Sequence, residues 1–206
     1  MTEQDFASLL VPLLKAHRLD LSEDQQGQLS RYYELLSRWN ERINLTALPM
    51  AGYPESTLNR LIVEPAIAST LLDDRPLHML DLGSGGGSPA IPLNIFRPMF
   101  RVTMVESRER KAAFLREAAR ECNLKHTAVI NSRFEELNIS VPVDVVTVRA
   151  VRLDGGVLSL IHRFLVPNGR LLIFGPRETP PLFRPLEYCQ LPGENSYLTL
   201  LVKEAG

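Results

Sequence analysis

The stretch from His78 to Pro89, HMLDLGSGGGSP, constrains the fold of this chain more than any other part of it. A short apolar run ends in an acid, four glycines follow within five residues, and a proline stands where a first helical turn could begin. Glycine permits positive φ angles and lets the backbone come close to a ligand. A helix start adds unpaired N–H groups that suit a polar or anionic group. The stretch therefore predicts a strand, a tight loop and a helix that together bind a small molecule.

Short apolar segments alternate with helical ones in the chain after residue 76. The expected strands cover residues 78–82, 101–106, 127–131, 143–148 and 169–174. The expected helices cover residues 89–97, 108–122 and 154–165. This order predicts an α/β fold with a mostly parallel, Rossmann-like sheet and helices on both faces. Such a sheet binds its ligands at the C-terminal ends of its strands.

The C-terminal part of the chain departs from this alternation. Four prolines break the pattern between residues 175 and 185. Residues 196–203, SYLTLLVK, then form a strand pattern with no helix before it. Because a strand reached without a crossover helix usually runs antiparallel to its neighbour, the sheet is expected to end in an antiparallel hairpin.

Residues 1–75 are predicted to form helices that pack as a cap on the domain of residues 76–206. Ser22 and Gln25 form a capping-box pattern, in which each side chain bonds to the other residue's backbone N–H. Apolar residues at helical spacing follow this pair. Pro65 is expected to kink or break the last of these helices.

Composition narrows the possible functions. A length of 206 residues suits one α/β domain with an extension, and a net charge of −1 excludes nucleic-acid binding by bulk attraction alone. Cys122 and Cys189 make no disulfide framework, and no Cys/His cluster indicates a metal. The sequence offers no apolar run of membrane-spanning length and no signal-like opening, which favours a cytoplasmic location. A monomer is expected.

The acids on either side of the glycines indicate which small molecule binds. Asp81 precedes Gly83 and Gly85, and Glu106 ends the next expected strand, where a carboxylate can accept hydrogen bonds from both ribose hydroxyls of an adenosine. A dinucleotide remains an alternative, because residues 85–90 match the G-x-G-x-x-G/A pattern by letter. S-adenosylmethionine is favoured over NAD, because Asp81 can hold its positively charged amino-acid end and a C-terminal hairpin is typical of methyltransferases of this fold. A turn that needs glycines for structural reasons alone is the third interpretation.

Two further loops follow expected strands. Phe134 can cover one face of an adenine, while Glu135 or nearby backbone meets its edge; the alternative is a helix start with a core phenylalanine and a solvated glutamate. Arg149 ends the fourth strand, where methyl donor and acceptor would meet, and it can pair with a carboxylate, a phosphate or a base edge. The structural alternative for Arg149 is a salt bridge with Asp144 or Asp154.

Several motifs together resemble the bacterial 16S rRNA guanine-N7 methyltransferase family, also called glucose-inhibited division protein B. The resemblance runs from about residue 20 to 175 and is most specific at the helix end W-N-x₃-N-L-T. The matching segments, in order, are Arg38-Trp39-Asn40, Asn44-Leu45-Thr46, Asp81 to Pro89 with Ile91-Pro92-Leu93, Glu106-Ser107, Arg110-Lys111, Phe114-Leu115, Ser132 to Glu136 and Arg149-Ala150.

The resemblance implies a class I S-adenosylmethionine-dependent methyltransferase that modifies N7 of one guanine in a small-subunit rRNA loop near the decoding site. Its partner would be 16S rRNA or the small ribosomal subunit. By the same resemblance, Glu106 matches the family's ribose-binding acid. The positions that match the family's cofactor contacts are Gly83, Ser88, Phe134, Glu135 and Arg149.

The chain departs from the family pattern before the glycine loop. Where the family usually has R-H-x-x-D-S, this sequence reads Arg60-Leu61-Ile62-Val63-Glu64-Pro65. Two other interpretations therefore stay open: a methyltransferase of this fold that acts on another RNA or a small molecule, and a non-catalytic S-adenosylmethionine-binding protein that associates with ribosomes. Guanine N7 carries a free lone pair, so neither a general base nor a covalent nucleophile is expected. From their places near strand ends, the candidates for RNA phosphate contacts are Arg60, Arg133, Arg152 and Arg177.

Overall fold

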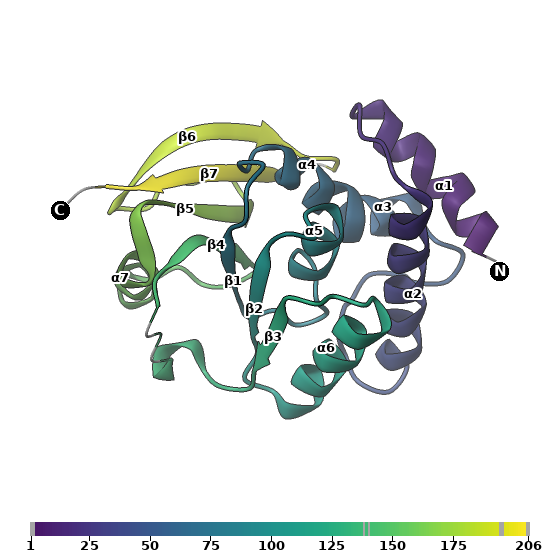
Figure 1. The fold of residues 1–206 in the computed structure, drawn as a ribbon, viewed down its shortest axis with the longest axis horizontal. Coiled ribbons are helices and arrows are strands. Elements are labelled where there is room, and N and C mark those ends of the chain that lie inside the picture. Colours follow the sequence, from purple (N-terminus) through teal and green to yellow (C-terminus); the bar gives the residue numbers. More distant parts are fainter. Residues whose placement is uncertain (1–2, 138, 140, 194–195, 205–206) are drawn as a thin grey trace.

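The computed structural model describes residues 3–137, 139, 141–193 and 196–204. Its centre is a seven-stranded sheet with the order β3-β2-β1-β4-β5-β7-β6 (Figure 1). The strands are β1 (His78–Leu82), β2 (Arg101–Val105), β3 (Thr127–Ile130), β4 (Val143–Arg149), β5 (Leu165–Gly175), β6 (Phe183–Gln190) and β7 (Tyr197–Lys203). Strands β1 to β5 run parallel, whereas β7 is antiparallel to both β5 and β6. The expected α/β class and the antiparallel C-terminal strand are confirmed.

The expectation for residues 175–185 is wrong at its C-terminal end, because β6 begins at Phe183 and includes Pro185. A proline cannot donate to a sheet ladder and is confined to edges and bulges. Strand β6 lies at the edge of the sheet, and its pairing with β7 shifts register between Pro185 and Glu187. The edge position of β6 and the register shift beside Pro185 therefore allow a proline in this strand. The same irregularity removes the alternating pattern by which the strand could be recognised in the sequence.

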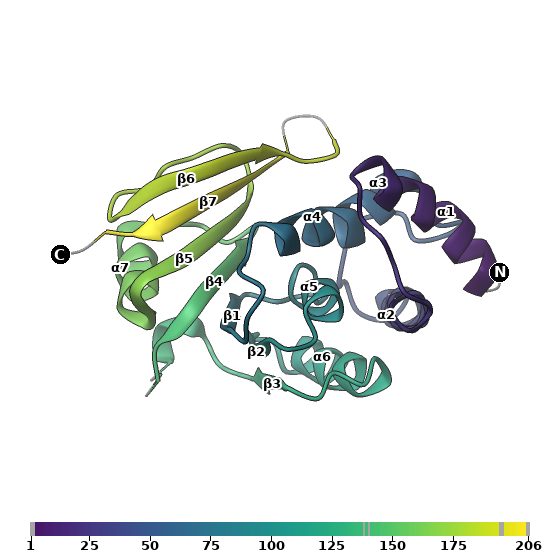
Figure 2. The ribbon, with the colours of Figure 1, turned by 45° about the horizontal axis from the view of Figure 1, so that its top comes forward.

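Helices cover both faces of the sheet, as the alternation predicts (Figure 2). One apolar core joins residues of the N-terminal helices, α5 (Ala90–Phe96) and α6 (Glu109–Glu121) to one face of the sheet, including Met79 and Val102. A second core lies between the other face, including Leu80 and Val146, and α7 (Gly155–Phe164). No helix in the described part of the chain is long and apolar enough to cross a membrane.

The N-terminal helices are α1 (Glu3–Ala16), α2 (Glu23–Asn40), α3 (Glu55–Leu58) and α4 (Glu64–Thr70), with a π-helical turn, Asn59–Val63, between the last two. The capping box at the start of α2 is confirmed: the Ser22 hydroxyl accepts from the N–H of Gln25, and the Ser22 N–H donates to the Gln25 side chain. The buried Phe6, Leu10 and Leu14 of α1 belong to the same core as α2 and the sheet.

Pro65 does not break the last helix, because helical residues run without a gap from Glu55 to Thr70, but the hydrogen bonds of the helix change next to it. The N–H of Glu64 donates to the carbonyl of Asn59, five residues back, so the carbonyl of Arg60 loses its usual partner. Pro65 has no N–H to offer the carbonyl of Leu61. Two neighbouring carbonyls on the π-helical turn are thus open to donors from elsewhere in the fold.

Candidate functional site

The glycine loop connects β1 to α5 at the C-terminal end of the parallel strands. Gly83, Gly85 and Gly87 have φ angles of 73°, 51° and 87°, which side chains strongly disfavour. A Cβ atom on Gly87 would also lie 2.6 Å from Cδ1 of Ile91. The hydroxyl of Tyr32, on α2, donates to the carbonyl of Gly86 at 2.7 Å. The positive φ angles of the loop therefore favour glycine, and the hydrogen bond from Tyr32 fixes the loop to α2.

The W-N-x₃-N-L-T segment at the end of α2 supports this loop. The Asn40 side-chain oxygen accepts from the N–H groups of Leu45 and Thr46, both at 2.9 Å. The carbonyl of Leu45 lies so close to the loop that a Cβ on Gly86 would be 3.3 Å from it. The structure thus gives Asn40 a local role: it shapes a turn that packs against the glycine loop.

Asp81 is the acid at the end of β1 and is 1% exposed. Its Oδ1 accepts a 2.6 Å hydrogen bond from Thr147, while its Oδ2 is buried without a hydrogen-bond partner among the described residues. Burial raises the pKa of Asp81 to about 6, although hydrogen bonds and the nearby Arg149 act in the opposite direction. A buried carboxylate oxygen without a donor beside a glycine loop suits a cationic ligand group.

Glu106 follows β2 directly and reaches the same loop. One carboxylate oxygen accepts from the N–H of Gly85 at 2.9 Å, and the other accepts from the N–H of Arg108 at 2.8 Å. The side chain of Asn131 donates to the backbone carbonyls of Glu106 and Ser107, which ties the loop after β3 to the end of β2. Each carboxylate oxygen has capacity for a second donor, so Glu106 can also accept from two hydroxyl groups.

Phe134 and Glu135 lie in a 3-10 turn, Phe134–Glu136, after β3. Phe134 is partly buried and packs against the core on the α7 side of the sheet, while Glu135 is exposed. Both follow the Asn131 link to Glu106 along the chain. The structure therefore places them at the same edge of the sheet as the ribose-binding candidate.

Arg149 ends β4 and is held by a buried carboxylate. Its Nη2 lies 2.7 Å from Oε2 of Glu64, and its Nη1 donates to the hydroxyl of Ser88 at 3.0 Å. The Glu64 and Arg149 side chains are 1% and 10% exposed. Burial lowers the pKa of Arg149 to about 10, and Glu64 is the largest opposing influence. The guanidinium also lies over the ring of Phe174, 4.5 Å from its centroid.

The expected structural alternative for Arg149, a salt bridge with Asp144 or Asp154, is wrong. Asp144 accepts from the backbone N–H of His78, and Asp154 caps the N-terminus of α7. The true partner, Glu64, is distant in sequence, and the fold brings it to the strand end.

The π-helical turn completes this arrangement. Its two open carbonyls receive donors from the functional loops: Arg149 Nη1 donates to the carbonyl of Arg60 at 2.6 Å, and Ser88 Oγ donates to the carbonyl of Leu61 at 2.9 Å. Ser196, directly before β7, donates to Oε1 of Glu64 at 3.1 Å. Neither Glu64 nor Ser196 is among the site residues predicted from sequence, because no local motif marks the pairing.

The four arginines predicted to contact RNA phosphates differ in their surroundings. Arg60 bonds to Glu64 and Ser196, and Arg177 lies over the ring of Tyr188, 3.9 Å from its centroid. Arg133 and Arg152 are exposed and have no ion pair with any described residue.

Comparison with known proteins identifies relatives over most of the chain. A family model described as rRNA small subunit methyltransferase G matches residues 25–177. A protein named ribosomal RNA small subunit methyltransferase G from Xanthomonas oryzae pv. oryzae is 39% identical over 170 residues, which cover 82% of this chain and 76% of that protein. The protein of the same name from Lactococcus lactis subsp. cremoris is 34% identical over 181 residues, covering 84% and 72%.

Solved structures share the fold at low sequence identity. An S-adenosylmethionine-dependent methyltransferase from Aquifex aeolicus superposes with a TM-score of 0.59 at 14% identity, covering 84% of this chain and 98% of that one. An rRNA methylase from Streptococcus thermophilus gives a TM-score of 0.51 at 16% identity, covering 69% and 96%. These neighbours show the class I methyltransferase architecture.

Proposed function

Because the chain belongs to the family of ribosomal RNA small subunit methyltransferase G, we propose that it methylates N7 of one guanine in 16S rRNA. Its cofactor is S-adenosylmethionine. The observation that carries the proposal beyond family membership is the Oδ2 of Asp81, which is buried without a hydrogen-bond partner among the described residues and lies beside a loop whose positive φ angles favour glycine.

The residues present fit this cofactor. We propose that Asp81 receives its positively charged amino-acid end, that Glu106 accepts from the ribose hydroxyls, and that Phe134 and Glu135 border the adenine. When bound, S-adenosylmethionine supplies a methyl group on a positively charged sulfur. Gly83 and Gly85 keep the backbone close enough for these contacts.

Arg149 is proposed to position the reacting groups. The base needs no deprotonation, because its N7 carries an accessible lone pair. The protein's task is then to align the acceptor with the methyl group and to suit the charge that moves to the base. Glu64, Ser88 and the carbonyl of Arg60 fix the guanidinium of Arg149 at the end of β4.

The helical segment of residues 1–75 is proposed to act as a cap on the catalytic domain of residues 76–206. It supplies Tyr32, which bonds to the glycine loop, and Glu64, which pairs with Arg149. The cap therefore supports both the cofactor loop and the strand end where the acceptor would lie.

Mapping of N7-methylguanine in 16S rRNA tests the function. We expect one guanine to lose its N7 methyl group when the gene is deleted and to regain it when the wild-type gene is restored. A gene encoding Asp81→Asn is the matched control and should restore little or none. If the methylation pattern of the deletion strain equals that of the parent, the proposed reaction is wrong.

Glu106→Ala is expected to weaken S-adenosylmethionine binding by about 1–3 kcal/mol, because two ribose hydroxyls lose their acceptor. Isothermal titration calorimetry measures the change. Glu109→Ala is the control, since Glu109 is an exposed acid in the first turn of α6. Equal affinities for the wild type and Glu106→Ala would limit Glu106 to holding the N–H groups of Gly85 and Arg108.

A further inference from the structure

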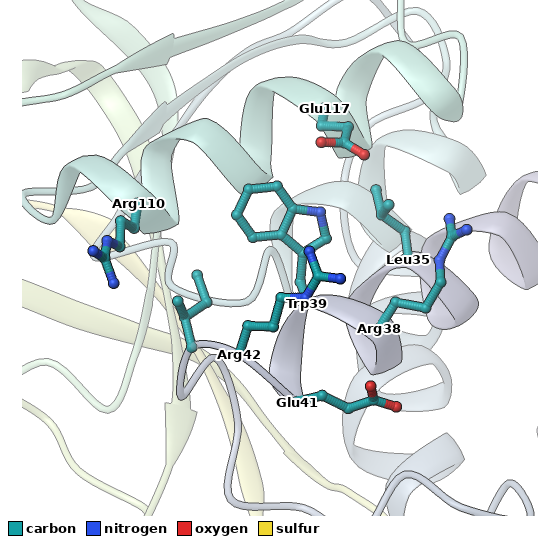
Figure 3. A pocket seen from close by; sticks show the side chains of 8 residues that line it. Leu35, Arg38, Trp39, Glu41, Arg42, Arg110 and Glu117 are labelled. Atoms are coloured by element: carbon teal, nitrogen blue, oxygen red, sulfur yellow. The ribbon is translucent and has the colours of Figure 1, made fainter.

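A groove lies between the C-terminal end of α2 and α6, with a volume of about 680 Å³ (Figure 3). Arg38, Trp39 and Arg42 line it from α2 and the residues just after, and Arg110 lines it from the first turn of α6. Figure 3 shows the indole of Trp39 between Arg110 on one side and Arg38 on the other. Two motif segments that the cofactor site leaves unexplained, Arg38-Trp39 and Arg110-Lys111, thus meet at one surface.

The three arginines of this groove have no structural task among the described residues. The side chains of Arg38, Arg42 and Arg110 make no hydrogen bond or ion pair with any residue that the structure describes. By contrast, Arg97 and Arg170 each bond to a carboxylate and to a backbone carbonyl. Guanidinium groups that are free and gathered in a groove are available to an outside acceptor.

The groove also offers a planar surface. Trp39, the only tryptophan of the chain, is partly exposed. It meets Phe114 in a T-shaped arrangement with centroids 5.9 Å apart. Stacking of bases on aromatic side chains stabilises the binding of single-stranded nucleic acid to a protein, and every base can stack in this way.

The position of the groove connects it to the proposed active site. Ile43, in its lining, lies within the turn that Asn40 shapes and that packs against Gly86 of the glycine loop. Arg110 lies four residues after Glu106 in the chain, at the same edge of the sheet. A chain bound in the groove would therefore run close to the cofactor loop.

The charges in the groove distinguish a nucleotide chain from a simple anion. Glu41 and Glu117 also line it and would repel a free phosphate or sulfate. An RNA strand presents phosphates for the arginines, rings for the indole, and amino groups or 2′-hydroxyls that carboxylates can accept from.

We propose that this groove binds an unpaired segment of the substrate RNA that flanks the target base. The inference rests on the proposed rRNA substrate and assigns RNA contacts to Arg38, Trp39, Arg42 and Arg110. They are distinct from the four arginines predicted near strand ends.

The single tryptophan makes the test direct. Titration of the protein with a single-stranded oligouridylate should quench tryptophan fluorescence and reduce its accessibility to acrylamide. The double variant R38Q/R110Q should bind the oligonucleotide about tenfold more weakly. Its slope of log affinity against log salt should be smaller by about 1.4, since each single-strand phosphate contact contributes about 0.7.

The control variant R163Q/R184Q removes the same charge from α7 and β6, at the other end of the molecule (Figure 1). It should bind the oligonucleotide nearly as the wild type does. Affinity for S-adenosylmethionine and kcat at saturating rRNA should stay unchanged in R38Q/R110Q, while KM for rRNA rises.

Unchanged tryptophan emission, or equal RNA affinity of the two double variants, would overturn the proposal. So would a loss of activity in R38Q/R110Q on assembled subunits with RNA affinity intact, which would assign the groove to a protein. These results leave methylation by the wild type in place, whereas a wild-type protein without methylation activity would instead refute the proposed function.

Discussion

Replacing Glu64 with glutamine is expected to lower the free energy of unfolding by about 3–5 kcal/mol, because it leaves Arg149 charged and buried without its ion-pair partner. Glu64 is 1% exposed and bonds to Arg149, Arg60 and Ser196. The charge of Arg149 persists at neutral pH, since burial lowers its pKa only to about 10. Urea unfolding at pH 7 measures the loss.

Two further variants make this measurement specific. The double variant E64Q/R149M removes both buried charges and should recover most of the lost stability. Glu55→Gln changes an exposed acid at the start of α3 and should alter stability by less than about 0.5 kcal/mol. If E64Q unfolds at the same urea concentration as the wild type, the ion pair contributes nothing measurable and Arg149 must be held by its other contacts.

Asp81→Asn is expected to weaken S-adenosylmethionine binding by about 3–5 kcal/mol, or at least about 100-fold. The reason is that the buried cationic end of the cofactor loses the carboxylate at the end of β1. The same change should stabilise the free protein at pH 7. A carboxylate with a raised pKa is ionised there at a cost, and a neutral amide avoids that cost.

The pH dependence of Asp81 provides an independent check. Its pKa of about 6 exceeds the ordinary value of 3.8, so the folded protein binds a proton more readily than the unfolded chain between these values. The stability contribution of this group therefore rises as pH falls from 6 towards 4. Cofactor affinity should fall over the same range, because the protonated acid no longer attracts a cation.

Calorimetry and thermal unfolding from pH 4.5 to 8 measure both trends. Asp81→Asn should bind the cofactor weakly at every pH and lose the steep part of the stability profile. Thr147→Val is a useful companion: it removes the donor to Oδ1 while the carboxylate stays in place. Wild-type affinity that is flat across pH 6 would show that Asp81 does not hold the charged end.

The parallel part of the sheet was predictable because its strands are mostly apolar and helices follow β1, β2 and β4. The elements around Asp81 and Glu106 accordingly lie where the sequence places them. Strand β6 was not predictable, because Pro185 and the register shift beside it remove the alternation that identifies a strand. Edge strands tolerate such irregularity since only one side must pair.

The partner of Arg149 shows a second limit of sequence reasoning. Sequence proximity favours Asp144 and Asp154, but these side chains serve the start of β1 and the cap of α7. Glu64 reaches Arg149 because the π-helical turn and the start of α4 lie beside the end of β4, where the Arg60 carbonyl and the Glu64 carboxylate both accept from Arg149. Pairings of this kind depend on tertiary packing, and no spacing rule along the chain contains them.

The π-helical turn before Pro65 has an evolutionary consequence. Its open carbonyls bind Arg149 and Ser88, so the identity of residue 65 affects two loops that are distant in sequence. A residue with an N–H at position 65 could compete for the Leu61 carbonyl and release the Ser88 hydroxyl. Substitutions at positions 64, 65, 88 and 149 should therefore be accepted in combination. In laboratory recombination, exchange of only one of the three segments that carry positions 64–65, 88 and 149 should give impaired chimeras more often than exchange of all three.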